Sequence, residues 1–370
     1  MRITAALAEG VRQPFHLREV ELEHPRHGEV LVRMAGSGIC HTDLICRDQW
    51  FPVPLPAVLG HEGSGIIEQV GPEVHHLAPG DRVVLSFNSC GQCRACLRGR
   101  SAYCADFFAR NFSGSRPDGS TPVRDGDHPA HAVFFGQSSF ATHAVVSERS
   151  VVKVDTHLPL ELLGPLGCGF QTGAGAVLNA LLCSPGSSIA VFGAGAVGCG
   201  AVMAAAIAGC STIAVLGRNA SRLARAKAVG ATHTVDLTLG DAAAVLRELT
   251  DGAGFDYSIE ATGAPAVLRQ AVDCLALEGV CGLVGAPALG TEARLDMSAL
   301  LFGRQVRGIV EGDSNPALFI PTLLDLHRQG RFPFDQLISL YPLGQINKAI
   351  DDMHHGRAVK PVLSFLGGPA

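Results

Sequence analysis

The sequence predicts an α/β fold in which a β-rich domain is followed by a doubly wound parallel sheet. Three observations support this prediction. The 370 residues exceed the roughly 250 to 300 at which a single hydrophobic core stops growing, so two domains are expected. Short β-rich runs between Pro and Gly turns fill the N-terminal part of the chain. Further along, strands and helices alternate, which is typical of a parallel sheet.

The expected domain boundaries follow from this change of pattern. We expect one domain over residues 1–169, to which residues 313–370 return, and a second domain over residues 170–312. The predicted strands of the first domain are Glu29–Met34, Gly65–Val70 and Arg82–Leu85. In the second part we expect strands over Ser188–Phe192, Thr212–Leu216, Tyr257–Glu260, Val280–Val284 and Gln305–Ile309, and helices over Gly198–Ala208, Ser221–Val229 and Pro316–Gln329.

The composition is that of an ordered globular protein, with 47% hydrophobic and 17% charged residues. The net charge of -5 carries no basic block, which disfavours a nucleic-acid surface or an anionic membrane and favours a small-molecule substrate. Residues 162–217 contain no charged residue and no histidine, so a membrane span is an alternative. Pro165, residues 183–186 and repeated glycines interrupt this stretch, which favours a buried parallel sheet with a packed helix.

The N-terminus and the cysteines indicate a compartment. Met1–Gly10 holds a short apolar run that ends at Glu9, without the longer apolar core and cleavage site of a signal peptide, so we expect a cytoplasmic protein. The twelve cysteines are then expected to be thiols or metal ligands rather than disulfides. Six have no metal-ligand spacing and are predicted to be small buried hydrophobes: Cys46, Cys183, Cys199, Cys210, Cys274 and Cys281.

A glycine motif opens the second domain. Ser187–Gly198 reads SSIAVFGAGAVG, a strand that runs into Gly193, Gly195 and Gly198 and then into a helix. In this context the first glycine allows a tight turn, the second lets the backbone approach a pyrophosphate, and the third lets the helix pack on the strand. The motif predicts a Rossmann dinucleotide site, the alternative being a purely structural glycine turn.

The residues after the second strand bear on the cofactor. An acidic residue that binds the ribose 2′-hydroxyl of NAD is expected there, but the chain has Gly217-Arg218-Asn219. Without a carboxylate to repel a 2′-phosphate, and with a guanidinium to pair with one, NADP(H) is favoured over NAD(H). The alternative is that Arg218 is a solvated surface charge and NAD is used.

Four closely spaced cysteines predict a metal site. Cys90, Cys93, Cys96 and Cys104 lie in CGQCRACLRGRSAYC. This spacing lets four thiolates share one tetrahedral ion with no open position, as in structural zinc sites. An iron–sulfur cluster is the alternative.

A second set of metal-ligating residue types is spread along the chain. It consists of Cys40 to Asp43 (CHTD), Gly60 to Gly63 (GHEG) and Gly167 to Phe170 (GCGF). Two cysteines and one histidine match a Cys₂His catalytic zinc site, whose fourth position holds water or alcohol. Each residue taken alone is equally consistent with packing.

At these residues the sequence resembles the zinc-containing medium-chain alcohol dehydrogenases, nearly from end to end. GHE, the four-cysteine lobe, GCGF and GAGAVG occur in that family's order and approximate spacing. The resemblance implies a β-rich GroES-like catalytic domain and a Rossmann nucleotide-binding domain. It implies two zinc ions per chain, a catalytic one on Cys40, His61 and Cys168 and a structural one on Cys90, Cys93, Cys96 and Cys104.

The resemblance also implies roles around these ligands. Glu62 lies beside the catalytic zinc, Asp43 hydrogen-bonds His61, and Thr42 takes the alcohol proton. The implied cofactor residues are Thr172 near the nicotinamide, His41 and Lys360 near the pyrophosphate, and the loop residues Gly193, Gly195, Gly198, Gly217 and Arg218.

One position departs from the family pattern. Where many members carry the histidine that ends the proton relay, this chain has Ile45. The relay must then end in water or another base, which predicts slower alcohol oxidation or a more alkaline optimum than in relatives with a complete relay.

Four aromatic residues are candidates for the substrate cleft: Trp50, Phe51, Phe87 and Phe134. Their surface would suit a flat apolar alcohol, although such residues are also ordinary core. Residues 40–56 and 311–316 resemble the aryl-alcohol (benzyl-alcohol) dehydrogenase branch. Phe51 stands where glutathione-dependent formaldehyde dehydrogenases carry an acidic residue, which disfavours that branch.

The sequence therefore favours a zinc-dependent oxidoreductase that reversibly transfers hydride between a primary aryl, allylic or similar apolar alcohol and NAD(P)⁺. The alternatives are a non-catalytic zinc-binding protein and a related polyol or quinone reductase. We expect a homodimer, with a homotetramer as the alternative, joined through the strands near Val280–Val284 and Gln305–Ile309.

Overall fold

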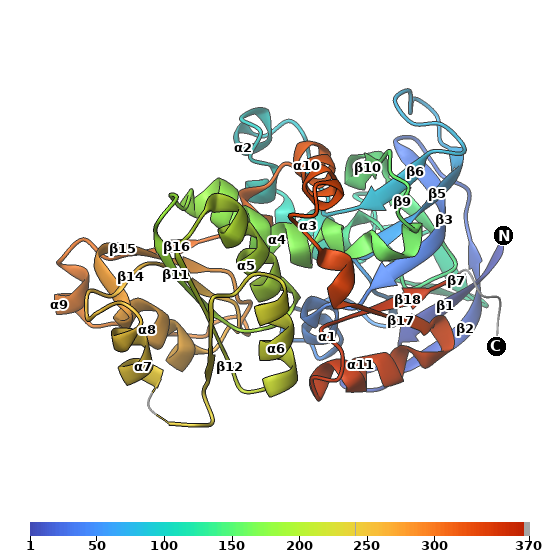
Figure 1. The fold of residues 1–370 in the computed structure, drawn as a ribbon. Helices are drawn as coiled ribbons and strands as arrows, with labels where there is room; N and C mark the ends of the chain where they lie inside the picture. The colour runs from blue at the N-terminus through green and yellow to red at the C-terminus, as the bar shows by residue number, and fades with distance from the viewer. Residues whose placement is uncertain (241, 366–370) are drawn as a thin grey trace. The chain divides into compact units, whose positions relative to one another are not determined.

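The chain divides into two compact units, which are described separately here (Figure 1). The computed structural model describes residues 1–240 and 242–365. The first unit comprises Met1–Cys168, Asn315–Thr322 and the segment from Ile338 onward, and the second comprises Gly169–Ser314 and Leu323–Leu337. The sequence placed residues 169 and 313–370 in the first domain, but 169, 313–314 and 323–337 group with the second unit. There Phe334 packs against Phe170 at 5.7 Å between ring centroids.

The first unit contains two antiparallel or mixed sheets. Within the described residues, one sheet has the order β4-β1-β2-β7-β8. Its strands are β1 (Arg2–Ala8), β2 (Phe15–Leu22), β4 (Ala57–Val58), β7 (Val123–Asp125) and β8 (His128–Ala130). All seven residues of β1 pair antiparallel with β2, and the four consecutive residues Ala5–Ala8 are buried.

The second sheet carries the residues that adjoin the candidate site. In the part of the chain that the structure describes, its order is β10-β6-β5-β3-β18-β17, with β9 paired to β3. Its strands are β3 (Glu29–Gly38), β5 (Glu62–Val70), β6 (Arg82–Leu85), β9 (His143–Ser147), β10 (Val151–Lys153), β17 (Ile338–Pro342) and β18 (Lys360–Ser364). Val30, Val32 and Met34 of β3 pack with Ile67 and Val83 in a buried cluster. β18 pairs antiparallel with β3, so residues from both ends of the chain share this sheet.

Short helices connect these strands. They are α1 (His41–Arg47), α2 (Arg94–Leu97), α3 (Phe107–Phe112) and α11 (Ile346–His354). The Asp43 carboxylate accepts the Cys40 N–H at 2.9 Å, which satisfies one backbone donor at the start of α1. α10 (Pro316–Arg328) begins in the first unit and ends in the second.

The second unit contains a parallel sheet with the predicted doubly wound topology. Within the described residues its order is β13-β12-β11-β14-β15-β16. The strands are β11 (Ser188–Phe192), β12 (Thr212–Gly217), β13 (His233–Asp236), β14 (Phe255–Glu260), β15 (Leu275–Leu283) and β16 (Gln305–Gly308). Numbered from β11, the order is 3-2-1-4-5-6, the Rossmann arrangement, in which ligands bind beyond the carboxyl ends of the central strands. The predicted fold class is therefore confirmed.

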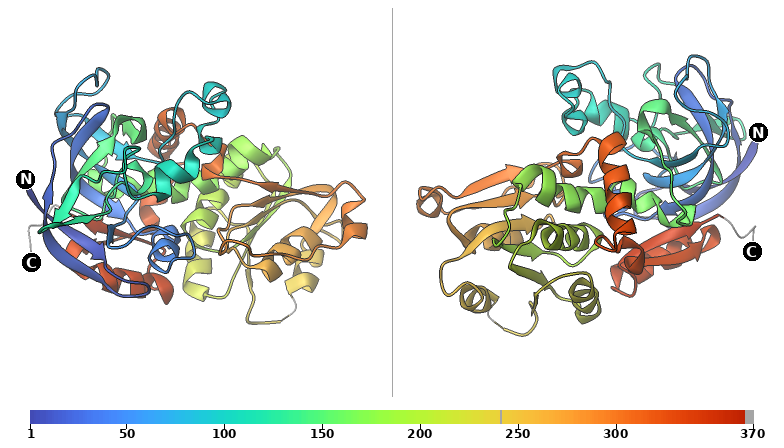
Figure 2. Two further views of the ribbon diagram at one scale, coloured as in Figure 1. Left: turned by 180° about the vertical axis from the view of Figure 1, so that it is seen from behind. Right: turned by 45° about the horizontal axis from the view of Figure 1, so that its top comes forward.

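Helices cover both faces of this sheet (Figures 1 and 2). α5 (Ala196–Ala208) and α6 (Ala220–Ala228) follow β11 and β12, whereas α7 (Ala242–Glu248) and α8 (Pro265–Asp273) flank β14. Leu246 of α7 and Leu268 of α8 join Phe192 and Leu216 in one buried cluster, so the apolar residues of the central strands are enclosed. The unit also contains α4 (Gly169–Gly175) and α9 (Met297–Leu300).

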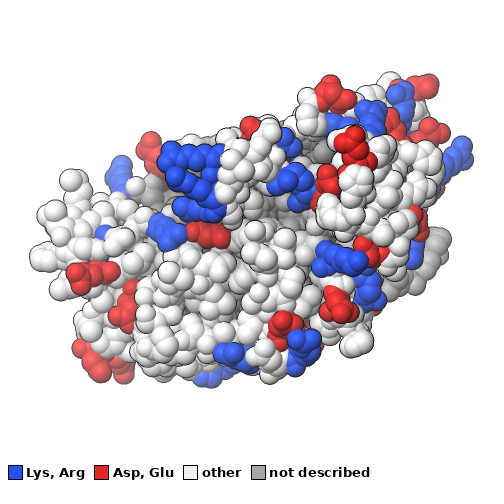
Figure 3. All heavy atoms as spheres, turned by 90° about the horizontal axis from the view of Figure 1, so that it is seen from above, with Lys and Arg blue, Asp and Glu red and all other residues white. Residues whose placement is uncertain are grey.

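The uncharged stretch 162–217 folds into ordinary secondary structure. It includes α4, a π-helical turn (Ala176–Leu181), β11, α5 and β12. Among the described residues, no helix combines the length and apolarity needed to cross a bilayer. Acidic and basic side chains lie interspersed on the face drawn in Figure 3.

All twelve cysteines are free thiols in the structure. Of the six predicted to be small buried hydrophobes, Cys46, Cys183, Cys199, Cys210 and Cys281 are buried and Cys274 is half-buried.

Candidate active site and cofactor loop

Four potential metal-binding side chains converge in the first unit. The donor atoms of Cys40, His61, Glu62 and Cys168 all lie within 4.8 Å of one another. Cys40 directly precedes α1, His61 directly precedes β5, and Cys168 follows a short 3-10 turn (Gly164–Gly167). The fold therefore brings together residues that are up to 128 positions apart in the sequence.

His61 is oriented by Asp43. The Asp43 Oδ1 atom lies 2.8 Å from His61 Nδ1 and also accepts the Gly60 N–H at 3.1 Å. Both side chains are fully buried. This contact leaves His61 Nε2 buried without a hydrogen-bond partner, which is costly unless the nitrogen binds something else.

This orphaned nitrogen fits a metal ion. An imidazole held at Nδ1 by a carboxylate presents Nε2 as a ligand, and the Cys40 and Cys168 thiols lie beside it. Hydrogen bonding with Cys168 lowers the pKa of Cys40, which favours the thiolate that a zinc ion requires. The donor set of two thiols, one imidazole and a nearby carboxylate suits zinc.

Glu62 forms a buried ion pair with Lys360 of β18. The Lys360 Nζ atom lies 2.9 Å and 2.8 Å from the two carboxylate oxygens and also donates to the Ile39 carbonyl at 3.1 Å. Burial raises the pKa of Glu62 to about 7, although the ammonium opposes the rise. Burial also opposes protonation of Lys360, but the charges of Glu62, Cys40 and Cys168 and the hydrogen bond to Glu62 together outweigh it and raise the lysine pKa. Lys360, predicted to lie near a pyrophosphate, is thus engaged beside the metal donors in this structure.

The other predicted site residues on and just after α1 differ in their exposure to solvent. Thr42 is half-buried and His41 is exposed. Ile45 is buried at 2% exposure, where the relay histidine of relatives was expected from the resemblance. Trp50, predicted to line the substrate cleft, is 42% exposed and makes an edge contact with His41 at 6.5 Å between ring centroids.

Phenylalanine rings form a wall against His61. Phe135 stacks on the imidazole at 4.6 Å, and Phe134 meets it edge-on at 5.5 Å. Phe51 and Phe112 continue the cluster, 5.7 Å apart. Of the four predicted substrate residues, Phe134 therefore contacts the imidazole and Phe51 lies in the same cluster. Phe87 reaches the cluster indirectly, through Phe107, whose ring centroid lies 5.9 Å from that of Phe87.

Several members of this wall were not predicted from the sequence: Phe107, Phe108, Phe112 and Phe135. The first three sit in FFARNF, the segment of α3, and Phe135 follows Phe134 directly. A local excess of phenylalanine close to a metal-ligand motif was the signal that could have found them.

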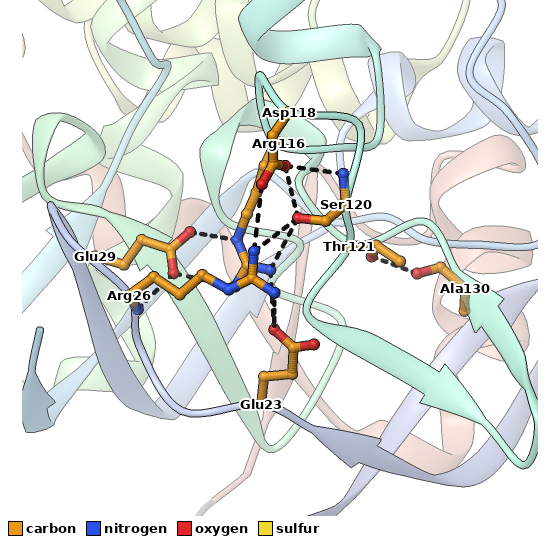
Figure 4. Close-up of polar contacts among 8 residues, drawn as sticks. All are labelled: Glu23, Arg26, Glu29, Arg116, Asp118, Ser120, Thr121 and Ala130. Atoms are coloured by element: carbon orange, nitrogen blue, oxygen red, sulfur yellow. Dashed lines mark hydrogen bonds and ion pairs between the residues drawn. The ribbon is translucent and has the colours of Figure 1, made fainter.

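A buried arginine anchors the segment that follows α3 (Figure 4). The Arg116 guanidinium donates to both carboxylate oxygens of Glu29, at 2.7 Å and 3.1 Å, and to Glu23 at 3.0 Å. Arg26 donates to Glu23 at 2.9 Å and to Ser120 at 3.0 Å, which closes the network. A planar guanidinium paired with a carboxylate through two hydrogen bonds holds a defined geometry, so this network ties the loop after the aromatic wall to the strands β2 and β3.

The four-cysteine lobe is compact as well. The sulfur-bearing side chains of Cys90, Cys93, Cys96 and Cys104 have donor atoms within 4.8 Å of one another. Backbone N–H groups point at the sulfurs: that of Cys93 donates to Cys90 at 3.3 Å, and that of Ala105 donates to Cys93 at 3.5 Å. Hydrogen bonding from Ala105 lowers the pKa of Cys93 to about 6, whereas burial raises that of Cys104 to about 12. A thiolate at Cys104 thus needs a cation nearby, and the donor set fits one tetrahedral zinc ion.

The glycine loop of the second unit fits a dinucleotide. Gly193 has φ 117°, a conformation that favours glycine. A Cβ atom at Gly198 would overlap the Gly193 carbonyl oxygen, whereas one at Gly195 would meet nothing within 4 Å. The backbone at Gly195 therefore faces open space at the N-terminus of α5, where a pyrophosphate is stabilised by free N–H groups and the helix dipole.

The remaining predicted cofactor residues lie in the same unit. Gly217 ends β12, and Arg218 follows it as an exposed side chain. Thr172 is buried in α4 and donates from its hydroxyl to the Glu311 carboxylate at 3.3 Å. Glu311, which was not predicted as a site residue, adopts φ 48°, a conformation uncommon outside glycine.

Comparisons with known proteins agree with this geometry. Residues 26–156 match the alcohol dehydrogenase GroES-like domain family, and residues 196–326 match the zinc-binding dehydrogenase family. The chain is 48% identical to the geraniol dehydrogenase of Castellaniella defragrans, over 98% of this chain and 97% of that protein.

Two solved structures extend the comparison. The benzyl alcohol dehydrogenase of Acinetobacter calcoaceticus superposes with a TM-score of 0.94 at 48% identity, over 98% of this chain and 99% of the other. A putative zinc-binding dehydrogenase from Sinorhizobium meliloti, bound to NADP, has a TM-score of 0.79 at 25% identity over the same shares of the two chains. Since these similarities extend over nearly the whole chain and its two domain families, the protein belongs to the zinc-binding alcohol dehydrogenase family.

Proposed function

We propose that this protein reversibly oxidises primary alcohols with an aryl, allylic or similar apolar group to aldehydes, and that a nicotinamide cofactor accepts the hydride. The observation that carries the proposal is the orphaned Nε2 of His61, which faces two thiols beside a wall of phenylalanine. The relatives named for geraniol and benzyl alcohol support an unsaturated or aromatic substrate.

The proposed mechanism divides the work among residues of the chain. Cys40, His61 and Cys168 would hold the catalytic zinc, which as a Lewis acid lowers the pKa of an alcohol hydroxyl in the way that it lowers that of water. Asp43 holds the His61 ring in the tautomer that leaves Nε2 free to bind. The Thr42 hydroxyl takes the alcohol proton, and the phenylalanine wall excludes water and binds the apolar group.

The buried Ile45 ends the side-chain proton path at this point of α1. The proton that Thr42 receives must then leave through water or through a base other than residue 45. This supports the expectation of a more alkaline optimum for alcohol oxidation than in relatives with a complete relay.

For the cofactor we propose NADP(H) rather than NAD(H). The exposed Arg218 after β12, in a place where no carboxylate occurs, supports pairing with a 2′-phosphate. The NADP bound by the Sinorhizobium meliloti protein is consistent with this preference. Gly193, Gly195 and Gly198 would receive the pyrophosphate.

We further propose a second, structural zinc ion on the four-cysteine lobe, a homodimer and a cytoplasmic location. Among the described residues β16 forms an edge of the parallel sheet, and Val306 on this strand and Leu301 and Phe302 before it are exposed. An edge strand with exposed apolar neighbours favours pairing with a second copy. Twelve free thiols favour a reducing compartment.

The test is steady-state oxidation of benzyl alcohol and geraniol with NAD⁺ and NADP⁺, followed by absorbance of the reduced nicotinamide. Cys168→Ser should lose activity by a factor of about 100 or more, because it removes a proposed zinc ligand. Cys274→Ser, the same change at a half-buried cysteine outside both clusters, should not.

The competing functions give different results in the same assay. A non-catalytic zinc protein would turn over no alcohol, and a polyol or quinone reductase would prefer polyols or quinones when these are added to the panel. Either result would contradict the proposal.

A further inference from the structure

The imidazole of His61 is enclosed by two consecutive phenylalanines. Phe135 lies almost parallel to it, with an interplanar angle of 30° and a centroid distance of 4.6 Å, and Phe134 stands at 89° to it. Phe135 is 3% exposed and Phe134 is fully buried. Asp43 anchors one ring nitrogen, so the two phenylalanines restrict the remaining rotation of the imidazole plane.

Phe135 reaches this position through an uncommon backbone conformation. Its φ and ψ are 52° and 29°, the left-handed region that bulky residues rarely adopt. Gly136 and Ser138 also have positive φ values, of 67° and 52°. Such strain persists only where the surroundings enforce it, and it gathers at functional sites.

Hydrogen bonds fix this turn to the residues on either side of His61. The Gln137 side-chain amide donates to the His61 carbonyl at 2.9 Å and accepts the Gly63 N–H at 3.1 Å. The Ser138 hydroxyl accepts the Phe134 N–H at 2.9 Å and donates to the Val58 carbonyl at 2.7 Å. The turn and the imidazole are thus fixed relative to each other by contacts on both sides of His61.

A ring that merely filled the core would not require this backbone. Phe140, for example, is fully buried and makes an edge contact with Phe15 without any positive φ. The strained conformation at Phe135 has one evident result, which is a ring stacked on the imidazole whose Nε2 faces the two thiols.

We propose that Phe135 is a positioning residue for the metal-binding imidazole: its stacked ring sets the plane of His61, so that Nε2 stays aimed at the ion shared with Cys40 and Cys168. The inference rests on the proposed function, because it assumes a metal ion at these donors. It assigns to Phe135 a role toward the metal ligand in addition to any contact with the alcohol.

The experiment compares four variants of the full-length, metal-loaded protein. Phe135→Tyr keeps the stacked ring, and Phe135→Leu keeps the bulk and the strained backbone but loses the ring. Phe135→Gly loses the ring and relieves the strain. The matched control is Phe112→Leu, the same change at a ring that contacts Phe135 at 5.2 Å but has no ring contact with His61 among those recorded for the described residues.

Three readouts separate positioning from packing. The first is the rate at which the ion leaves the Cys40, His61 and Cys168 site to a chromogenic chelator. The second is the visible spectrum of the protein with Co²⁺ at that site, which reports ligand geometry. The third is the midpoint of thermal unfolding, Tm.

We expect Phe135→Leu and Phe135→Gly to release the ion about 10-fold faster or more, as when an outer partner of a ligand is removed. Their cobalt spectra should shift, whatever fall in Tm the loss of a buried ring causes. Phe135→Tyr should restore the native release rate and spectrum. Phe112→Leu should lower Tm while leaving both metal readouts unchanged.

Native release rates and spectra in both Phe135→Leu and Phe135→Gly would overturn the inference, as would release rates that follow Tm across all four variants. Failure of the proposed function would look different. In that case the wild-type protein would take up no ion at Cys40, His61 and Cys168, whatever the residue at 135.

Discussion

Lys360 and Glu62 form an ion pair that is almost completely shielded from water, with side-chain exposures of 3% and 0%. Removing two charges from water is unfavourable, and their attraction offsets this cost only while both are present. The pair joins β18 to β5 next to the metal donors. Its loss should therefore lower the free energy of unfolding of the first unit.

Replacing Lys360 alone should therefore be strongly destabilising. We expect Lys360→Met to lower the free energy of unfolding at neutral pH by about 3–5 kcal/mol, measured by urea denaturation. The loss should shrink toward acid pH, because burial already raises the pKa of Glu62 to about 7 and a protonated carboxyl no longer needs the ammonium. The double variant Lys360→Met/Glu62→Gln should regain much of the loss, and equal stabilities of the single and double variants would contradict this account.

Asp43 should control the affinity for the catalytic ion. In Asp43→Asn the amide can no longer hold the His61 Nδ1 proton as a carboxylate does, so we expect zinc affinity to fall about 10- to 100-fold. Competition with a chelator of known affinity measures this. Asp48→Asn, which removes a partly exposed partner of Arg47 just after the same helix, is the control and should retain native affinity.

Arg218 should determine the cofactor preference. Loss of a charge-assisted pair with a phosphate amounts to about 1.5–3 kcal/mol, so Arg218→Ala should reduce kcat/KM for NADP⁺ by roughly 10- to 100-fold and leave that for NAD⁺ nearly unchanged. Arg225→Ala, a change at an exposed arginine of α6, should alter neither value. A wild-type enzyme with a strong preference for NAD⁺ would refute this role for Arg218.

Ile45→His should alter the pH dependence of alcohol oxidation. A histidine with a pKa near 6.5 would offer Thr42 a base, so the rise of kcat with pH should move to lower pH. Ile45→Val retains the apolar character of this buried position and should keep the native profile. If Ile45→His leaves the pH profile unchanged, position 45 does not limit the path of the proton.

Asp352 should stabilise the protein in a pH-dependent manner. Hydrogen bonds from Lys348, Arg357 and Tyr341 hold its pKa well below the ordinary aspartate value of 3.8. A depressed carboxyl pKa contributes stability that is fully present above 3.8 and is lost as the pH falls through the folded-state pKa. Asp352→Asn should therefore lower Tm at neutral pH, and the difference from wild type should vanish in acid.

The control for this change is Asp351→Asn, at the neighbouring exposed carboxylate, where the Tm difference should be small throughout. A Tm difference for Asp352→Asn that persists unchanged below the folded-state pKa would show that the effect is steric rather than electrostatic.

Local motifs explain what could be predicted from the sequence. The spacing of Cys90 to Cys104 and the pattern around Gly193 encode their geometry within a few residues, and the structure brings each set together. Alternating strands and helices likewise indicated the parallel sheet, although β15 begins at Leu275 rather than Val280. Strand ends depend on pairing with neighbours, which a single strand does not reveal.

Long-range pairing explains what was missed. The contact between Lys360 and Glu62 depends on β18 lying beside β3, across more than 320 positions, and no local pattern encodes it. The stacking of Phe135 depends on a left-handed turn, whereas the sequence shows only two adjacent phenylalanines. Trp50 was predicted with Phe51 to line the substrate cleft, and its edge contact with His41 was not foreseen, because it depends on the chain path after α1.

The pairing of β18 with β3 also has a consequence for the order in which the protein matures. Cys40, His61 and Cys168 all precede Lys360, which pairs with Glu62 beside them, by 192 residues or more. Domains generally fold as units as the chain emerges, but the sheet of the first unit lacks β17 and β18 until residues 338–364 have been made. The growing chain thus carries all seven candidate metal ligands before the strand that bears Lys360 has been made.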